Sequence, residues 1–149
     1  MTYPVWKIKT FHQLTTIELY EILKIRQEVF IVEQTCFYLD ADGADEKAVH
    51  IWAENEGKAV AYCRVFKAGV KYDECSIGRV LTHPNYRKLQ LGKTLMAIAI
   101  STIENRFSSR KIRISAQDYL LKFYKEFGFQ DIGLHYLEDD IPHTEMLRE

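Results

Sequence analysis

Residues 74–96 read ECSIGRVLTHPNYRKLQLGKTLM, and this stretch decides the fold class of the chain. Residues 75–82 are rich in β-branched side chains and are followed by a His-Pro pair, so they predict a strand. From Leu91 to Ile103, apolar residues recur at the 3.6-residue spacing of a helix that buries one face. The stretch therefore predicts a strand, a turn and an amphipathic helix.

The predicted helix begins without a usual N-cap residue. Gln90 and Leu91 stand where Ser, Thr, Asp or Asn would normally accept hydrogen bonds from the free backbone amides. Three basic residues, Arg87, Lys88 and Lys93, lie close to these amides in the sequence. A helix N-terminus with free amides and a basic approach is a site for a phosphate group.

Three interpretations of this turn are open. In the first, it is an ordinary connection, and Gly92 only permits close packing. In the second, it is a Walker A nucleotide site, because residues 92–94 match its Gly-Lys-Thr end. The first glycine of that motif would fall at position 87, which is Arg87, and this disfavours it. In the third, the turn binds the pyrophosphate of a coenzyme other than a nucleoside triphosphate.

A family resemblance supports the third interpretation. Arg87-x-x-Gln90-x-Gly92 resembles the R/Q-x-x-G-x-G/A signature of the GNAT N-acetyltransferase superfamily, and residues 77–84 resemble the fourth strand of that family. The resemblance implies that the loop and the helix start bind the pyrophosphate of acetyl-CoA. One departure is Gln90, which replaces the first glycine and puts a close backbone approach or a positive φ in question.

Two further segments carry the resemblance. Residues 26–34, RQEVFIVEQ, resemble the R-x-x-V-F-x-x-E-Q stretch of the ElaA-like branch, and residues 123–129, FYKEFGF, resemble the Y-x-x-x-G-F end of the motif B helix. The resemblance implies one GNAT domain over residues 1–149. The expected fold is α/β (α+β), with a mixed, mostly antiparallel twisted sheet of six to seven strands and about four helices.

Local patterns place the other elements. Strands are expected at residues 5–9, 49–53, 58–66, 111–116, 132–137 and 144–147. Thr15 and Glu18 form a capping box that starts a helix ending near Phe30 or Glu33. Asp118 is expected to cap a short helix that Gly128 ends. The strand–helix–strand unit over residues 75–116 predicts a parallel strand pair.

The acidic segment 40–45, DADGAD, has three interpretations: a calcium loop, a rim that attracts the acceptor amine, or a solvated turn. Calcium is disfavoured because, counting from Asp40, Gly43 is fourth and Ile51 twelfth, whereas an EF-hand needs Gly sixth and Glu twelfth. The solvated turn is the default. Arg64 and Arg79, on nearby predicted strands, either hold an anionic group or pair with acidic side chains, and we favour pairing.

Composition limits the choice of partners. A net charge of −1 gives no field that favours nucleic acid or a membrane surface. No apolar run approaches the roughly 20 residues of a membrane helix, and no signal-peptide pattern opens the sequence. Three widely spaced cysteines indicate reduced thiols rather than disulfides or a zinc site. We expect a cytoplasmic protein that uses no metal and binds neither nucleic acid nor membrane.

The resemblance implies direct transfer of an acetyl group from acetyl-CoA, as co-substrate, to a small-molecule or peptide primary amine, with a homodimer left open. Tyr124 is the expected general acid toward the CoA thiolate. Glu33, Glu74 and His50 are candidate general bases, and together with the acidic segment they are placed on the acceptor side. The expected coenzyme-binding residues are Val80, Leu81, Thr82, Arg87, Lys88, Gln90, Leu91, Gly92, Lys93, Thr94, Gln117 and Tyr124.

Two other functions are compatible with the sequence. A binding module could hold an acyl-CoA without turning it over. A Cys/His hydrolase could use Cys36, Cys63 or Cys75 with one of the five histidines, although Cys63 and Cys75 lie in apolar strands, where cysteines are usually buried and inert. The identity of the acceptor amine is not encoded in any motif we recognise.

Overall fold

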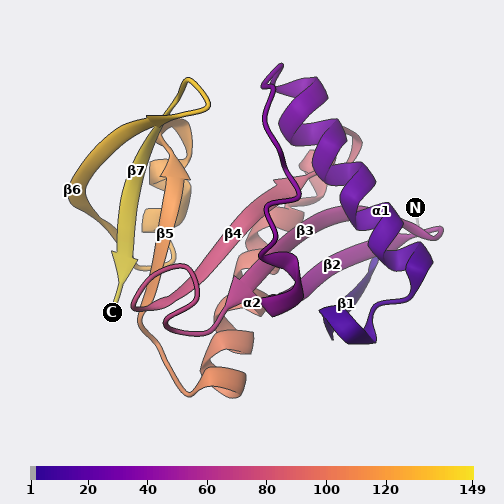
Figure 1. The fold of residues 1–149 in the computed structure, drawn as a ribbon, viewed down its shortest axis with the longest axis horizontal. Helices are drawn as coiled ribbons and strands as arrows, with labels where there is room; N and C mark the ends of the chain where they lie inside the picture. The colour runs from indigo at the N-terminus through magenta and orange to yellow at the C-terminus, as the bar shows by residue number, and fades with distance from the viewer. Residues whose placement is uncertain (1–2) are drawn as a thin grey trace.

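One seven-stranded sheet forms the centre of the computed structural model, which describes residues 3–149 (Figure 1). The strands are β1 (Val5–Thr10), β2 (Val49–Asn55), β3 (Lys58–Phe66), β4 (Cys75–Thr82), β5 (Ile112–Gln117), β6 (Phe129–Glu138) and β7 (Ile141–Arg148). Their spatial order is β1-β2-β3-β4-β5-β7-β6. Only β4 and β5 pair in parallel, so the predicted mixed, mostly antiparallel sheet is confirmed.

Three α-helices accompany the sheet: α1 (Thr16–Arg26), α2 (Leu91–Phe107) and α3 (Leu121–Lys125). The predicted capping box starts α1, since the Thr15 hydroxyl accepts from the Glu18 amide and the Glu18 carboxylate accepts from the Thr15 amide. Beyond Arg26 the helix continues in π geometry over Gln27–Glu33. It therefore ends at Glu33, as the sequence predicted, but the change to π geometry was not predicted. Such π segments are frequent at functional sites.

The two faces of the sheet are covered by different helices. α1 lies in front of the sheet and α2 behind it in Figure 1. Because neighbouring strand residues point to opposite faces, Ile51 and Cys63 pack in the cluster that includes α2, whereas Trp52 and Tyr62 pack with α1. β3 is consequently buried along nearly its whole length.

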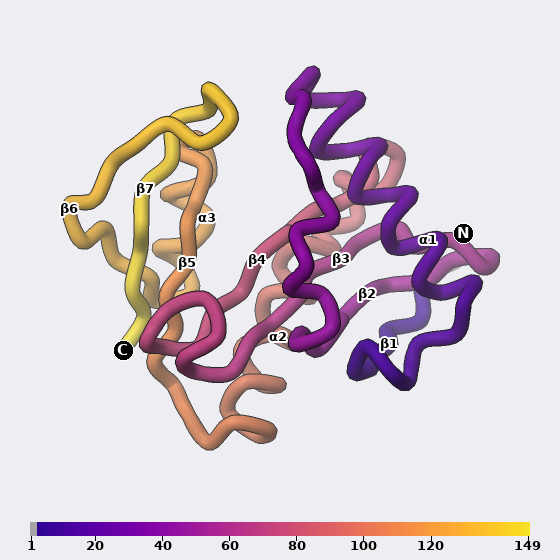
Figure 2. The backbone as a smooth tube through the Cα atoms, viewed as in Figure 1, coloured from indigo at the N-terminus to yellow at the C-terminus, as the bar shows by residue number. Residues whose placement is uncertain are grey.

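The sheet divides at the β4–β5 pair. Only two residue pairs join these strands, Cys75 with Ile112 and Ser76 with Arg113, and Figure 2 shows β4 diverging from β5 beyond them. β4 also shifts register against β3 at a bulge where Arg79 adopts a φ of 52°. A bulge bends its strand and increases the local twist, which widens the separation. The carboxyl ends of β4 and β5 therefore lie apart.

One predicted helix start was wrong. Asp118 does not cap a helix with its side chain, because its carboxylate accepts a hydrogen bond from the Thr144 hydroxyl of β7 at 2.6 Å. A short 3₁₀ turn over Asp118–Leu120 instead leads into α3. The helix itself ends at Lys125, three residues before the predicted Gly128, which closes the following turn with a φ of 91°. In the described residues, no helix is long and apolar enough to cross a membrane.

Candidate active site

The start of α2 has the geometry expected of an anion site. Gln90 adopts a left-handed conformation, with φ 55° and ψ 32°, and its side chain caps none of the first amides of the helix. The residue that replaces the signature glycine thus reaches the positive φ that a glycine would supply. The turn of the signature is preserved, and the Gln90 side chain is exposed.

A cavity of about 540 Å³ opens beside this helix start, and we call it the coenzyme cavity after the role expected of its residues from the sequence. It is lined by Val29, Glu33, Gln34, Val80, Leu81, Thr82, Arg87, Gln90, Gly92, Lys93, Tyr119, Leu120, Phe123 and Tyr124. Most residues predicted to bind the coenzyme are in this set. Among the others, Lys88 and Thr94 are exposed outside it, Leu91 is buried in the core, and Gln117 lines a neighbouring cavity.

Gly92 contributes to the shape of the coenzyme cavity. A Cβ built at Gly92 would lie 3.7 Å from the Phe123 ring and 3.9 Å from Thr82 Oγ1, which is ordinary van der Waals contact. An alanine would fit there, whereas a larger side chain would project into the space between β4 and α3. The absence of a side chain keeps the approach to the backbone of α2 open.

A second cavity of about 270 Å³, here called the acceptor cavity, lies between β4, β5 and the β6–β7 turn. The residues that it shares with the coenzyme cavity are Gln34, Val80, Tyr119, Leu120 and Tyr124. The two cavities therefore adjoin, and Val80 and Tyr124 lie where they meet. Cys36, Arg79, Gln117 and His143 are among the residues that line only the acceptor cavity.

Tyr124 is buried in α3, with 5% of its surface exposed, yet it lines both cavities. Burial raises the pKa of the Tyr124 phenol, so the hydroxyl remains protonated at neutral pH. Its ring packs edge-on against Phe123 and Phe129. In the described part of the chain no hydrogen bond to the hydroxyl is found, and a protonated donor is left at the junction of the cavities.

Glu33 and Arg87, predicted for different roles, form an ion pair with each other. Arg87 donates from Nη1 and Nη2 to the two carboxylate oxygens of Glu33 at 2.7 and 2.6 Å, and from Nε to the Thr82 carbonyl at 3.1 Å. The Arg87 guanidinium lowers the pKa of Glu33. Both side chains line the coenzyme cavity, so this pair bridges its mouth from the π segment to the turn before α2.

Two of the three candidate bases lie away from both cavities. Glu74 precedes β4 and accepts from Arg113 Nε and Nη2 at 2.8 and 2.9 Å, and this guanidinium lowers the pKa of Glu74 to about 2. His50 is buried, with Nε2 2.9 Å from the Asp45 carbonyl and Nδ1 2.6 Å from the Tyr62 hydroxyl. Since a carbonyl only accepts, His50 Nδ1 must accept from Tyr62 and its lone pair is occupied.

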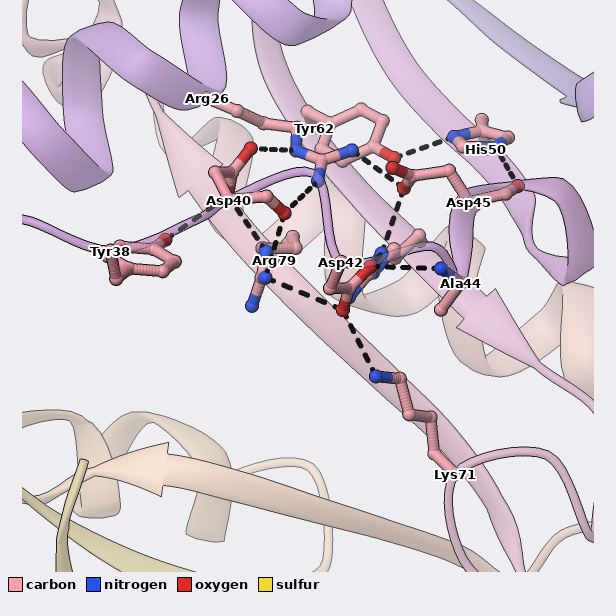
Figure 3. Close-up of polar contacts among 11 residues, drawn as sticks. Arg26, Tyr38, Asp40, Asp42, Ala44, Asp45, His50, Tyr62, Lys71 and Arg79 are labelled. Carbon is pink, nitrogen blue, oxygen red and sulfur yellow. Dashed lines mark hydrogen bonds and ion pairs between the residues drawn. The ribbon is translucent and has the colours of Figure 1, made fainter. Parts of the chain in front are cut away.

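The acidic segment 40–45 is not a solvated turn. Arg26, fully buried, donates from Nε to Asp40 at 2.8 Å and from Nη1 to Asp45 at 2.7 Å. Arg64 donates to Asp45 at 2.8 Å and to Asp42 at 2.9 and 2.5 Å. Figure 3 shows how these groups converge beside β3 and β4. The expected pairing of Arg64 with acidic side chains is confirmed.

The network continues through Lys71 and Arg79. Lys71 donates to Asp42 at 3.1 Å, and Arg79 Nη2 donates to the Asp40 carbonyl at 3.1 Å, with Arg79 Nε 2.9 Å from Asp40 Oδ1 (Figure 3). The Arg64 guanidinium holds the pKa of Asp42 well below its usual range. All the carboxylates expected to attract an amine, in this segment and at positions 33 and 74, are thus paired with cations of the chain itself.

Sequence reasoning missed the far wall of the acceptor cavity. Glu138, Asp139 and His143 line it from the β6–β7 hairpin. His143 Nδ1 lies 2.7 Å from the Ile141 carbonyl and donates to it, and Nε2 lies 3.3 Å from a Glu138 oxygen. No motif marks these residues, and only the pairing of β7 with β5 brings them beside Tyr124.

The cysteines do not form a hydrolase site. Cys63 and Cys75 lie in the core of the sheet, and burial raises the pKa of the Cys63 thiol. The Cys36 thiol donates to the backbone carbonyls of Gln34 and Asp139. None of the cysteines is hydrogen-bonded to a histidine within residues 3–149, and in the same range no group of three or more His, Cys, Asp or Glu is arranged to hold a metal.

Comparison with known families decides the class of the protein. Residues 21–149 match the family model described as acetyltransferase (GNAT) domain. The chain belongs to the GNAT acetyltransferase family. The protein is an enzyme of the N-acetyltransferase type.

Two solved structures and one sequence illustrate the similarity. An acyl-CoA N-acyltransferase from Pseudomonas aeruginosa is 37% identical, with a TM-score of 0.92 over 97% of this chain and 99% of that one. Escherichia coli ElaA is 34% identical, with a TM-score of 0.90 over the same shares. A UPF0039 protein of Schizosaccharomyces pombe is 41% identical over 143 residues, 95% of this chain and 94% of that protein. The ElaA-like resemblance is confirmed.

Proposed function

We propose that this enzyme moves the acetyl group of acetyl-CoA directly to a primary amine. The coenzyme occupies the coenzyme cavity and the amine occupies the acceptor cavity. The single observation that carries the proposal is that the two cavities adjoin at Val80 and Tyr124. Holding an amine and a thioester together at such a junction is proximity catalysis, which needs no nucleophilic cysteine.

The acetyl transfer conserves atoms and charge. The acceptor arrives as an ammonium and gives one proton to a base, and its nitrogen then attacks the thioester carbonyl carbon. The C–N bond forms and the C–S bond breaks. The nitrogen loses its second proton and the departing sulfur gains one, so the products are an amide, CoA thiol and one released proton.

The coenzyme would be held by the start of α2. The first amides of α2 and the Lys93 side chain are available for the pyrophosphate, and Arg87 is available once it leaves Glu33. The backbone N–H near Val80 or Leu81 is the proposed donor to the carbonyl oxygen of the tetrahedral intermediate. The bulge at Arg79 supports this role, because a register shift leaves backbone groups outside the strand ladder.

Glu33 and His143 are the two proposed general bases, one from each cavity. Glu33 lines the coenzyme cavity but is occupied by Arg87 in this conformation. His143 lines the acceptor cavity, and its Nε2 is the ring nitrogen that the Ile141 carbonyl leaves available. A pH–rate profile that loses its acidic limb in His143→Gln, but not in Glu33→Gln, would assign the base to His143. The reverse pattern would assign it to Glu33.

Tyr124 is the proposed acid toward the departing thiolate. A thiolate leaving into an apolar channel is poorly solvated, and a protonated phenol can donate to it. We predict that Tyr124→Phe lowers kcat by about 10²–10⁴-fold, the usual contribution of general acid catalysis. Calorimetry should show nearly unchanged coenzyme affinity, and Tyr20→Phe, on the exposed face of α1, serves as the matched control.

The same assay tests the function as a whole. Release of free CoA thiol that requires an added amine supports acetyl transfer, and a series of acetyl-, propionyl- and longer acyl-CoA substrates measures acyl specificity. Coenzyme binding without transfer to any amine would favour the binding module instead. We also propose a cytoplasmic location, which is supported by three unpaired cysteines.

A further inference from the structure

The acceptor cavity has one wall with an unmatched positive charge. The ion-pair network beside β4 joins four cationic side chains, Arg26, Arg64, Lys71 and Arg79, to three carboxylates, Asp40, Asp42 and Asp45. The other titratable groups in contact with it are neutral, because burial lowers the pKa of His50 and raises the pKa of Tyr38 and Tyr62. One positive charge is therefore left over.

This charge lies at the side of the network that faces the cavity. Arg26 and Arg64 are closed off from solvent, whereas the side chains of Arg79 and Lys71 are 23% and 36% exposed and line the acceptor cavity. Asp42 lines it with them and offsets one of these two positive charges. In Figure 3, Nε and one terminal nitrogen of Arg79 reach Asp40 or Asp42, and the other terminal nitrogen has no partner among the residues drawn. A guanidinium edge is thus available to a ligand.

The opposite wall carries unmatched negative charge. Glu138 and Asp139 line the acceptor cavity from the β6–β7 turn. Within the described residues, the one ion pair of Glu138 is with His143, which is cationic only if protonated, and Asp139 has none. The nearby Arg113 is taken by Glu74 and Glu145. The two walls therefore have opposite charge, and Tyr124 lines the same cavity.

We propose that the acceptor is a small amine that also carries an anionic group. Its anion lies against Arg79 and Lys71, and its ammonium faces Glu138 and Asp139 before deprotonation. A volume of about 270 Å³ is at the low end for ligand pockets, which suits a small molecule. A polyamine is disfavoured as the acceptor, because its second ammonium group would lie against the positively charged wall and be repelled. This inference rests on the proposed acetyl transfer and narrows its acceptor.

The experiment compares matched amines. Each amino acid of a panel is paired with the amine that lacks its carboxylate, such as lysine with 1,5-diaminopentane, and glucosamine 6-phosphate is paired with glucosamine. The expected result is a kcat/KM at least roughly tenfold higher for the anionic member of a pair, as charged hydrogen bonds in a partly closed site give. The carboxylate and phosphate arms identify which anion is used.

Variants test the wall itself. Lys71→Glu should reverse the sign of the unmatched charge on this wall and raise KM for the anionic member by at least roughly tenfold, without raising KM for the counterpart that lacks the anionic group. Lys67→Glu is the matched control, because Lys67 is exposed on the same segment and lies outside the cavity. Equal effects of Lys71→Glu on both members of a pair would overturn the inference.

The remaining outcomes separate the two proposals. If polyamines are acetylated as well as or better than the anionic amines, the inference is wrong and the acetyltransferase function stands. If the wild-type enzyme binds coenzyme but acetylates only amines without an anionic group, the inference is again wrong. If it binds coenzyme and acetylates no member of the panel, the binding module is favoured over both proposals. If calorimetry finds no coenzyme binding, the proposed function itself fails.

Discussion

At the scale of single residues, the Glu33–Arg87 ion pair opposes the roles proposed for its two members, Glu33 as a general base and Arg87 as a ligand of the coenzyme. Arg87 is proposed to meet the coenzyme pyrophosphate, yet both ends of its guanidinium are engaged by Glu33. A doubly charged pyrophosphate beside a helix N-terminus is a strong competitor for this guanidinium. Coenzyme binding is then coupled to the release of a carboxylate at the mouth of the cavity.

We predict that Glu33→Gln strengthens coenzyme binding. Removing the competing carboxylate frees Arg87, and exposed ion pairs are worth about 0.2–1 kcal/mol, so the dissociation constant should fall by up to about fivefold. Arg87→Gln should weaken binding, and the double variant should match Arg87→Gln alone. Calorimetry with CoA measures all three. Glu28→Gln, an exposed carboxylate on the same π segment, should change nothing.

At the residue scale, the sequence does not show that two of the candidate bases are already engaged by other side chains. Glu74 and His50 have the right chemistry, but Arg113 and Tyr62 occupy their proton-accepting atoms. These partners lie 39 and 12 residues away in the sequence, so a reader of the chain alone cannot see them. Tyr124 and the turn over residues 87–92 could be proposed from the sequence because their signals are local motifs.

At the scale of elements, the start of α1 couples helix capping to ion pairing. Glu18 accepts from the Thr15 amide and also from Lys9 and Lys7 of β1, at 2.8 and 3.2 Å. Burial alone would raise the pKa of Glu18, but these partners together lower it to about 2. The capping box was predictable from a four-residue spacing, whereas the two lysines come from the pairing of β1 with β2.

The lowered pKa of Glu18 predicts acid sensitivity. A carboxyl with a depressed folded pKa stabilises the protein fully above its unfolded pKa of about 4.5, and this contribution is lost as the pH falls toward 2. Glu18→Gln keeps the capping hydrogen bond and loses the ion pairs, so it should cost about 1 kcal/mol at pH 7.

Chemical denaturation of both proteins between pH 7 and pH 2 checks this prediction. The difference in unfolding free energy between the wild type and Glu18→Gln should shrink as the pH falls, because the Glu18 carboxyl becomes protonated in the folded as well as in the unfolded protein. Glu21→Gln, one turn later on α1, is the matched control. A difference that stays constant down to pH 2 would show that the ion pairs of Glu18 contribute nothing.

Element boundaries show the same limit of sequence reasoning. Strand positions followed from alternation and turn residues, so β2, β3 and β4 lie where they were expected. The predicted Asp118 cap was wrong because Thr144, 26 residues later, competes for the carboxylate. The acidic segment was misinterpreted for a similar reason, since Arg26 and Arg64 reach it from α1 and β3.

At the scale of the whole molecule, the acceptor site is an interface between two halves of one sheet. The positive wall belongs to the β1–β4 half and the negative wall to the β5–β7–β6 half. Their separation depends on the bulge at Arg79 and on the early end of the β4–β5 pairing. Neither feature has a sequence signature. The family resemblance therefore predicted the fold, whereas the arrangement of charges on the two walls could be seen only in the structure.

The two-residue junction between β4 and β5 has a consequence for amide hydrogen exchange. Past Ser76 and Arg113, the facing edges of these strands lack partners on that side in the described structure. Backbone amides on these edges should exchange readily in the free enzyme, because local opening there breaks few hydrogen bonds. Saturating CoA should slow exchange across residues 77–82 and 114–117 by at least about tenfold and leave β2, enclosed between β1 and β3, unchanged. Mass spectrometry of the deuterated protein measures this protection, which would show that bound CoA stabilises the facing edges of β4 and β5.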